Sequence, residues 1–343
     1  MSQELLNILN DLLKSKSYND IAKELNIASG TVKRWNELNN VPQAYCFELM
    51  KLAQIPIQYS KFNYKEKDQF FTPQKTAQLC IEKAFNILNT HNIDINDYTF
   101  IEPSAGNGSF YKLLPSKKIG IDIEPKSENI IQQDYLQYLP SINEKYIVFG
   151  NPPFGLRGQL ALKFINHSAK FADFVCFILP QLFESDGKGV PRKRVQGLNL
   201  IHSEKLNSDF EDPDGKKICV ECIFQIWAKH IKNENYEIKQ LDESTLKIYS
   251  LSDGGTPSTT RNKKMFNCCH IYLPSTCFGK ENMKYYESFE ELPNRKGYGI
   301  VFLKDKETNI QKFKQIVWHE VAFLSTNSAY NIRTSQINDM FIQ

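Results

Sequence analysis

The residues with the clearest chemical potential follow one another directly, as Asn151-Pro152-Pro153-Phe154. They come after an apolar run, residues 146–150, which is typical of a buried strand. Two consecutive prolines restrict the backbone, so the Asn151 side chain and the Pro152 carbonyl are held rigidly at the end of that strand. These two groups offer acceptors to one amino group, and the Phe154 ring offers a face for stacking. We therefore expect this tetrapeptide to be catalytic.

An acidic residue ends each of three other short apolar runs. Glu102 precedes a small-residue turn, in which Gly106 and Gly108 permit a sharp bend and a close approach to a ligand. Asp122, about twenty residues further on, can accept both hydroxyls of a ribose, as in dinucleotide folds. Asp134 can accept from the exocyclic amine of adenine, and it can also cap the helical segment that follows. A carboxylate beside the glycine turn favours a cationic ligand over a pyrophosphate.

Short apolar runs alternate with helical patterns from about residue 65 to residue 232, which indicates an α/β fold with a mainly parallel sheet. The preceding residues, 1–60, are almost entirely helical in pattern. Residues 250–264 are rich in Ser, Gly and Thr, as in a flexible linker. We therefore expect a helical domain at 1–60, an α/β domain at 61–249, a linker at 250–264 and a separate region at 265–343.

The N-terminal segment has the pattern of a helix-turn-helix. Apolar residues mark the inner faces of two short helices, whereas Lys33 and Arg34 face outward on the second. Residues 1–60 hold six basic and six acidic residues, so their field is neutral. The second helix therefore has two open roles, in a DNA major groove or in packing and dimerisation.

The composition favours a globular protein and argues against a membrane-spanning or secreted one. The 343 residues carry a net charge of +3, and 41% are hydrophobic, as in a soluble globular protein. No apolar stretch is long enough to span a membrane, and the amphipathic start does not look like a secretory signal. Eight scattered cysteines favour a reducing cytoplasm. Cys219 and Cys222 lie in an apolar run, and we interpret them as core thiols, so no metal site is expected.

Together these motifs resemble those of the S-adenosylmethionine-dependent N6-adenine DNA methyltransferases of the gamma arrangement, over about residues 69–227. In that arrangement the cofactor motif precedes the catalytic motif, and a recognition region follows. The resemblance implies a Rossmann-like, seven-stranded methyltransferase sheet, with residues 174–180 as one strand and 219–227 as the final antiparallel strand. It also implies methyl transfer from S-adenosylmethionine to the N6 amine of a flipped adenine, in a sequence-specific manner.

The resemblance assigns particular residues to the cofactor and to the base. Residues 69–73 resemble the motif that packs on the methionine end of the cofactor, and Glu102 would reach toward the methionine ammonium. Phe224 would stack on the flipped adenine. The implied cofactor-binding residues are Phe70, Thr72, Pro73, Glu102, Ser104, Gly106, Gly108, Asp122, Ile123 and Asp134, and the implied catalytic residues are Asn151, Pro152, Pro153 and Phe154.

Basic residues suggest where nucleic acid would be held. A run at 184–194 contains Lys188, Arg192, Lys193 and Arg194, which we expect to contact phosphates, although such a run can also be a solvated surface. From Arg261 onward the chain has 12 basic and eight acidic residues. This local excess favours residues 265–343 as the target-recognition region.

Three functions remain open at this point. The first is a DNA adenine methyltransferase, whose partner is double-stranded DNA and whose protein partner would be a restriction endonuclease or a second copy of the chain. The second is a methyltransferase acting on RNA or on a protein amide. The third is a DNA-binding regulator with a vestigial catalytic domain, against which the intact tetrapeptide at 151–154 argues. A membrane is not expected as a partner.

Overall fold

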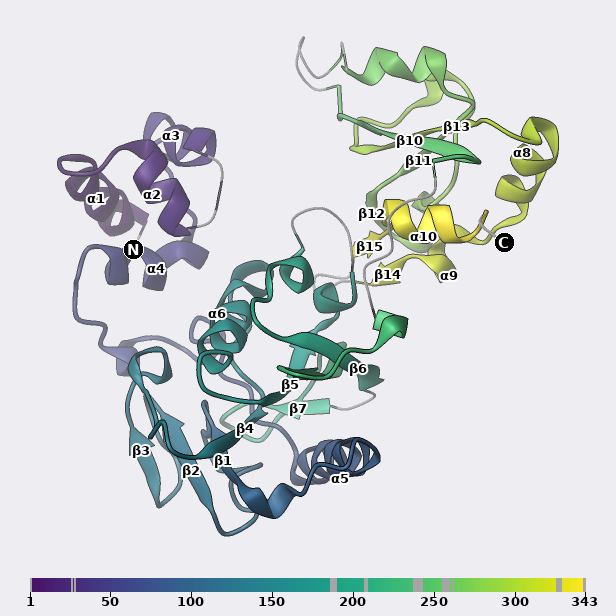
Figure 1. Ribbon diagram of the computed structural model, residues 1–343. Coiled ribbons are helices and arrows are strands. Elements are labelled where there is room, and N and C mark those ends of the chain that lie inside the picture. The colour runs from purple at the N-terminus through teal and green to yellow at the C-terminus, as the bar shows by residue number, and fades with distance from the viewer. Residues whose placement is uncertain are drawn as a thin grey trace. The chain divides into compact units, whose positions relative to one another are not determined.

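The computed structural model describes the chain except for Met1, Asn26, Ala28, Arg261 and residues 186–189, 207–208, 237–242, 255–259, 325–328 and 342–343. It divides into two compact units, Met1–Phe70 and Phe71–Gln343 (Figure 1). Lys188, one of the residues expected to contact phosphate, lies outside the described residues.

The first unit is helical. Its helices are α1 (Ser2–Leu13), α2 (Tyr18–Leu25), α3 (Ser29–Glu37) and α4 (Cys46–Leu52), with short 3₁₀ turns at Gln43–Tyr45 and Tyr59–Lys61. A capping box precedes α2, because Ser17 Oγ accepts from Asp20 N at 3.2 Å and Asp20 Oδ2 accepts from Ser17 N at 3.0 Å. The apolar stripes of α2 and α3 are buried in a common core, as expected from their spacing; their buried residues are Ile21, Ala22, Leu25, Val32 and Trp35.

A seven-stranded sheet forms the centre of the second unit, with the order β3-β2-β1-β4-β5-β9-β6. Six strands run in one direction, and β9 runs antiparallel to both of its neighbours. This confirms the expected Rossmann-like, seven-stranded α/β class. The strands are β1 (Tyr98–Glu102), β2 (Lys118–Asp122), β3 (Ile130–Gln132), β4 (Lys145–Gly150), β5 (Phe174–Pro180), β6 (Asn199–Leu206) and β9 (Cys222–Ala228).

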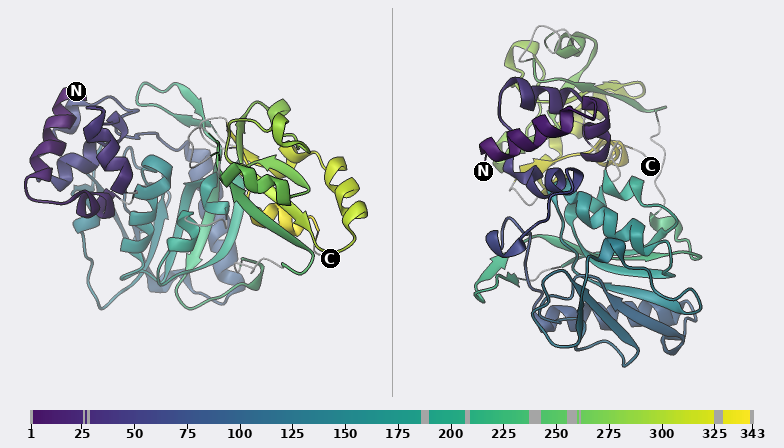
Figure 2. Two further views of the ribbon diagram at one scale, coloured as in Figure 1. Left: turned by 90° about the horizontal axis from the view of Figure 1, so that it is seen from above. Right: turned by 90° about the vertical axis from the view of Figure 1, so that its left-hand side faces the viewer.

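Helices cover both faces of this sheet, which explains why its central strands are apolar throughout. On one face Val148 packs in a core with Leu162 and Ile165 of α6 (Gln159–Ser168). On the other, the ring of Phe149 meets that of Phe85, from α5 (Gln74–Thr90), at 6.0 Å. Figure 2 shows α5 beneath the sheet and α6 above it. Every residue of β5 is buried, so the sheet is a rigid base for the loops at its edge.

The expected final strand, residues 219–227, is divided in the structure. Residue 219 ends β8 (Lys217–Cys219), which forms a hairpin with β7 (Asp209–Glu211), whereas β9 begins at Cys222. The apolar run continues through both segments, so its sequence pattern does not mark the break.

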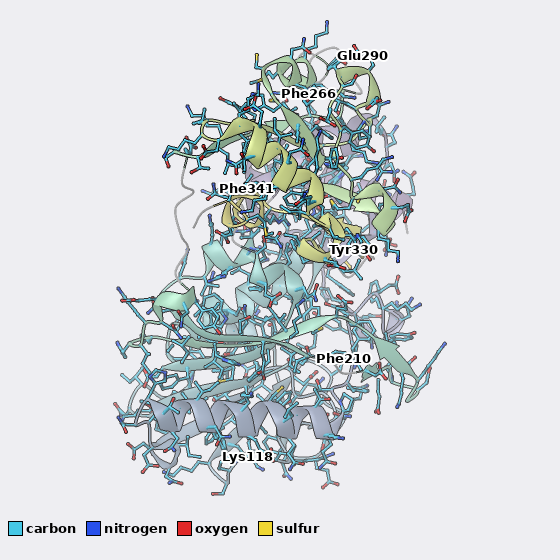
Figure 3. The ribbon with its side chains drawn as sticks, turned by 90° about the vertical axis from the view of Figure 1, so that its right-hand side faces the viewer. Lys118, Phe210, Phe266, Glu290, Tyr330 and Phe341 are labelled. Atoms are coloured by element: carbon cyan, nitrogen blue, oxygen red, sulfur yellow. The ribbon has the colours of Figure 1, made fainter. Side chains whose placement is uncertain are left out.

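In the C-terminal part of the second unit, the described residues include two small sheets and the helices α8, α9 and α10. One sheet has the order β10-β13-β11 and the other β12-β15-β14. In Figure 3, Phe266 and Phe341 mark two separate cores of this part. The elements are β10 (Leu246–Leu251), β11 (Ile271–Pro274), β12 (Thr276–Phe278), β13 (Gly297–Phe302), β14 (Phe323–Leu324), β15 (Ala329–Asn331), α8 (Lys306–Gln315), α9 (Trp318–Val321) and α10 (Thr334–Asp339).

Strand β10 alters the expected domain boundary. It pairs along its whole length with β13, so Leu246 lies opposite Phe302 and Leu251 opposite Gly297. The expected boundary at residues 249–250 therefore falls inside a strand of the C-terminal part. Residues 250 and 251 belong to this sheet and not to a linker.

Candidate functional site

The ends of three parallel strands bring predicted residues together. Glu102 ends β1, Asp122 ends β2, and residue 150 ends β4, so all three meet at the carboxyl edge of the sheet. Ligands of doubly wound folds bind at this edge, because the loops there diverge from a rigid sheet. The candidate site therefore consists of the loops that follow these strands.

The glycine turn after β1 has the backbone that its sequence requires. Gly106 and Gly108 have φ values of +49° and +80°, in the left-handed region where other residues are strained. A Cβ built at Gly106 would lie 3.1 Å from Cε1 of Phe71. Both conformation and space therefore call for glycine at position 106.

Phe71 is a candidate site residue that lies within the expected motif, residues 69–73, but was not among the expected cofactor-binding residues, which include its neighbours Phe70 and Thr72. Its backbone exchanges two hydrogen bonds with Glu211, of 2.7 and 2.9 Å, which hold its ring beside the glycine turn. Thr72 is buried and Pro73 precedes α5. Phe70 belongs to the first unit, where its ring meets that of Tyr64 at 6.0 Å.

Asp122 joins the glycine turn to the end of β2. Its Oδ2 accepts from Gly106 N at 2.8 Å, and its Oδ1 accepts from Glu124 N at 2.7 Å. Burial raises the pKa of Asp122, and these two hydrogen bonds oppose the shift. A carboxylate has about four lone-pair sites, so it retains capacity for ligand hydroxyls. Ile123, the next residue, is 37% exposed beside it.

Glu102 is almost completely buried, and its Oε2 accepts from Tyr111 N at 2.6 Å. Burial raises the pKa of this carboxyl well above its ordinary value, although hydrogen bonds from the Tyr111 and Phe110 backbone lower it. Phe110 and Tyr111 lie in a series of successive turns. Glu102 therefore anchors these turns to β1, which is a positioning role in the structure.

Asp134 caps a short 3₁₀ helix, Tyr135–Gln137, because its Oδ1 accepts from Leu136 N at 3.0 Å. The capping role allowed by the sequence is thus confirmed. The loop that holds it is attached to the neighbouring strand, since Gln133 N donates to Asp122 O at 2.9 Å. Contact with an adenine is compatible with this position and stays a prediction.

The tetrapeptide after β4 carries the most distinctive polar group. Asn151 Oδ1 is buried and has no hydrogen-bond partner among the described residues. Leaving a buried acceptor unpaired costs about 1–3 kcal/mol. The main-chain oxygen of Asn151 accepts from Ser104 Oγ at 3.1 Å, which ties this loop to the glycine turn. The loop is thus held in place, while the side-chain oxygen keeps its capacity to accept a hydrogen bond.

The rest of the tetrapeptide forms a supported loop. Pro152 is buried, and the Phe154 ring is partly exposed and packs against the core of the sheet. The Phe154 carbonyl accepts from Leu160 N at 3.1 Å and Ala161 N at 3.2 Å, so the loop is fixed to the start of α6.

A second unpartnered amide lies at the next strand. Gln181 follows β5 directly, is 6% exposed, and its Oε1 has no partner in the described part of the chain. Sequence reasoning missed Gln181, since a glutamine after a strand is not by itself a chemical signal. Its position beside β4 makes it a further acceptor at this edge.

Phe224 is placed differently from its predicted role. It lies in the middle of β9, between Ile178 and Glu204, and its exposed fraction is 0%. A ring without exposed surface offers no face to a flipped base, so the structure does not support stacking by Phe224. Every residue of β9 is buried, which is typical of a nearly continuous apolar run in a strand that is covered on both faces.

The basic run forms a short 3₁₀ helix, Pro191–Arg194, between β5 and β6. Arg192 donates to the carbonyl oxygens of Glu184 and Tyr236, whereas Lys193 is exposed. Asn166 of α6 holds the run, since its Nδ2 donates to Arg194 O at 3.1 Å. Phosphate contact by Arg192, Lys193 and Arg194 stays a prediction.

No protein-family model and no curated protein matches the chain. Among solved structures, a protein from Pyrococcus horikoshii, provisionally assigned as an RNA methyltransferase, is 17% identical, with a TM-score of 0.36, covering 48% of this chain and 87% of its own. The 23S rRNA methyltransferase ErmE is 11% identical, with a TM-score of 0.32, and the match covers 48% and 70%. The type IIG restriction endonuclease BpuSI is 12% identical, with a TM-score of 0.35, over 93% of this chain and 43% of its own. Similarity at this level does not identify an activity.

Within the described residues, none of the helices combines the length and apolar composition that a membrane crossing requires.

Proposed function

We propose that this protein is an S-adenosylmethionine-dependent methyltransferase that modifies the N6 amine of a flipped adenine in double-stranded DNA. The observation that carries the proposal is the buried, unpartnered Asn151 Oδ1 at the carboxyl edge of the sheet, in an Asn-Pro-Pro-Phe loop. An amino group can donate the hydrogen bond that this acceptor lacks.

The residues around the glycine turn fit the adenosyl cofactor. Gly106 leaves room next to Phe71, and Asp122 keeps acceptor capacity for ribose hydroxyls. In this proposal Asp122 binds the ribose, Asp134 the adenine ring, and the Phe71 ring covers the turn in place of Phe70. The cofactor, when bound, supplies an electrophilic methyl group.

The chain's part in the chemistry is to activate a poor nucleophile. The amine of adenine is conjugated to the ring, so its lone pair is delocalised. Asn151 Oδ1 and the Pro152 carbonyl would accept hydrogen bonds from its two N–H groups. This lets the nitrogen become pyramidal and present its lone pair to the methyl group. Phe154 would stack on the extruded base. No covalent intermediate and no strong base is required, because the methylated nitrogen would be cationic and would lose its extra proton to water.

Double-stranded DNA is the proposed partner, read by the basic C-terminal part and held by Arg192, Lys193 and Arg194. A restriction endonuclease or a second copy of the chain is the protein partner to be sought. The helix-turn-helix-like unit is proposed to support DNA binding through Lys33 and Arg34, which are exposed on α3.

The decisive experiment incubates the protein with labelled cofactor and, separately, with duplex DNA, RNA and a glutamine-containing peptide. The DNA is then digested to nucleosides, and N6-methyladenine is the expected labelled product. If only RNA or only the peptide became labelled, methyl transfer would be supported but DNA would not be the substrate. Binding of DNA with no label in any substrate would favour a regulator with a vestigial domain.

A further inference from the structure

A pocket of about 390 Å³ lies beside the edge strand β6, away from the candidate site. Asn199 begins β6 and pairs with Ala228 at the end of β9, so this pocket is near the amino edge of the sheet. Asn151 and Asp122 are at the carboxyl edge. Its polar and charged lining includes Arg192, Lys193, Asn199, Trp227, Lys232 and Asn233.

The charge of the pocket has one sign. Three cations line it, and no carboxylate is among its described lining residues. Neither Lys193 nor Lys232 has an ion-pair partner among the residues that the structure describes. The positive charge of these two lysines favours an anionic ligand.

Trp227 adds an unpartnered donor. Its side chain is 3% exposed, and its Nε1 is buried without a hydrogen-bond partner in the described part of the chain. Indole nitrogen can only donate, so the group that would satisfy it is an acceptor. An anion with several acceptor oxygens meets this need together with the charge of the lysines.

The walls of the pocket are fixed by the backbone. The pairing of β6 with β9 shifts between Leu200 and His202, and Asn233 Nδ2 donates to the carbonyl of the intervening Ile201 at 3.0 Å. Val195, Leu198 and Leu200 add apolar surface to the lining. The volume falls in the range of small-molecule sites, about 300–1,000 Å³.

We propose that this pocket binds a phosphate ester of the size of a mononucleotide, with the phosphate on the lysines and the Trp227 N–H and the apolar part on the leucines. Two sources share this chemistry, a free nucleotide and the phosphorylated end of a nucleic-acid strand. Arg192 and Lys193 also belong to the run proposed to hold DNA, so the test uses Lys232 and Trp227, which have no part in the proposed methyl transfer.

The test measures binding of UMP, uridine and inorganic phosphate to the full-length protein by calorimetry. We expect UMP and phosphate to bind and uridine not to bind. Lys232→Gln and Trp227→Phe should each weaken UMP binding about tenfold or more, the effect of losing one hydrogen bond to a charged group. Lys117→Gln is the matched control, since Lys117 is exposed and precedes β2, five positions from β6 in the sheet.

Absence of UMP binding at millimolar concentration would overturn the proposal, as would equal losses in Lys232→Gln and Lys117→Gln. Thermal unfolding without ligand checks that Trp227→Phe is folded, and Lys232→Gln carries the test if it is not. Competition of UMP with 5′-phosphorylated and unphosphorylated oligonucleotides distinguishes the two sources. If a strand end enters the pocket, the phosphorylated oligonucleotide should compete with UMP and the unphosphorylated one should not.

Discussion

At the residue scale, Asn151 Oδ1 is buried and accepts no hydrogen bond from the described residues, so a variant can test its proposed catalytic role separately from the stability of the fold. We expect Asn151→Ala to lower the transfer rate at least about a hundredfold, as the loss of one preorganised polar group in an active site does. The free energy of unfolding should not fall, because the described residues offer no partner for this oxygen and its removal relieves the cost of burying it unpaired.

Cofactor affinity should change little in this variant, since Asn151 is assigned to the amine. Rate, calorimetric affinity and urea unfolding are measured together. Asn143→Ala removes an exposed asparagine just before β4 and serves as the control. Comparable methylation by Asn151→Ala would show that the tetrapeptide does not act on the amine.

Glu102 gives a pH-dependent prediction. Burial raises its pKa in the folded state well above the ordinary carboxyl value near 4.3, so folding favours the protonated form. Its contribution to stability is therefore present at acidic pH and is lost as pH rises through the raised pKa. In Glu102→Gln the amide oxygen can still accept from Tyr111 N without carrying a charge.

The stability of Glu102→Gln relative to the unmodified protein should thus increase from acidic to neutral pH. Denaturant unfolding over this range checks the difference. Glu128→Gln neutralises an exposed carboxylate, and its difference in stability from the unmodified protein should depend much less on pH. If the stability difference of Glu102→Gln did not change with pH, the charged form of Glu102 would not destabilise the folded state.

At the scale of elements, the glycine turn after β1 is the part with the strictest conformational demand. Gly106→Ala should destabilise the protein by about 1–2 kcal/mol from its left-handed backbone alone. It should also weaken cofactor binding, because its Cβ would crowd the Phe71 ring. Gly215→Ala is a matched control, since Gly215 has φ +79° with no atom within 4 Å of a built Cβ.

Gly215→Ala should therefore lose similar stability but keep its cofactor affinity. Thermal unfolding and calorimetry are compared for the two variants. Equal affinities would remove the glycine turn from the cofactor site.

The sequence was sufficient to predict the central sheet and the polar residues at its carboxyl edge, but not the placement of Phe71 and Gln181. Buried parallel strands are continuous apolar runs, and the polar residue after each run marks the carboxyl edge, as at Glu102, Asp122 and Asn151. Long-range pairing could not be predicted in this way. The pairing of β10 with β13 and the burial of Phe224 both depend on segments distant in sequence.

At the scale of the whole molecule, the two units and the C-terminal part can be tested separately. A chain lacking residues 1–60 should remain folded and methylate DNA with unchanged site selectivity, because the candidate site residues from Phe71 onward belong to the second unit. Its DNA affinity should show a smaller salt dependence, by about 2 in the log–log slope if Lys33 and Arg34 both contact phosphates.

A chain ending at residue 245 should bind cofactor but lose site-selective methylation. The break is placed before β10, because ending the chain at residue 264 would leave β10 without β13. Methylation is measured at two salt concentrations with both truncations. Loss of selectivity in the N-terminal truncation alone would assign sequence recognition to the helical unit.

The hydrogen bond from Ser104 to the carbonyl of Asn151 has a thermodynamic consequence. It joins the loop proposed for the cofactor to the loop proposed for the base, so a shift in one loop is felt in the other. Linkage then requires reciprocity: if bound cofactor changes the affinity for the base by some factor, bound base changes the affinity for the cofactor by the same factor. Ser104→Ala should bring both factors closer to one, by equal amounts, and thereby make the two ligands more independent of each other.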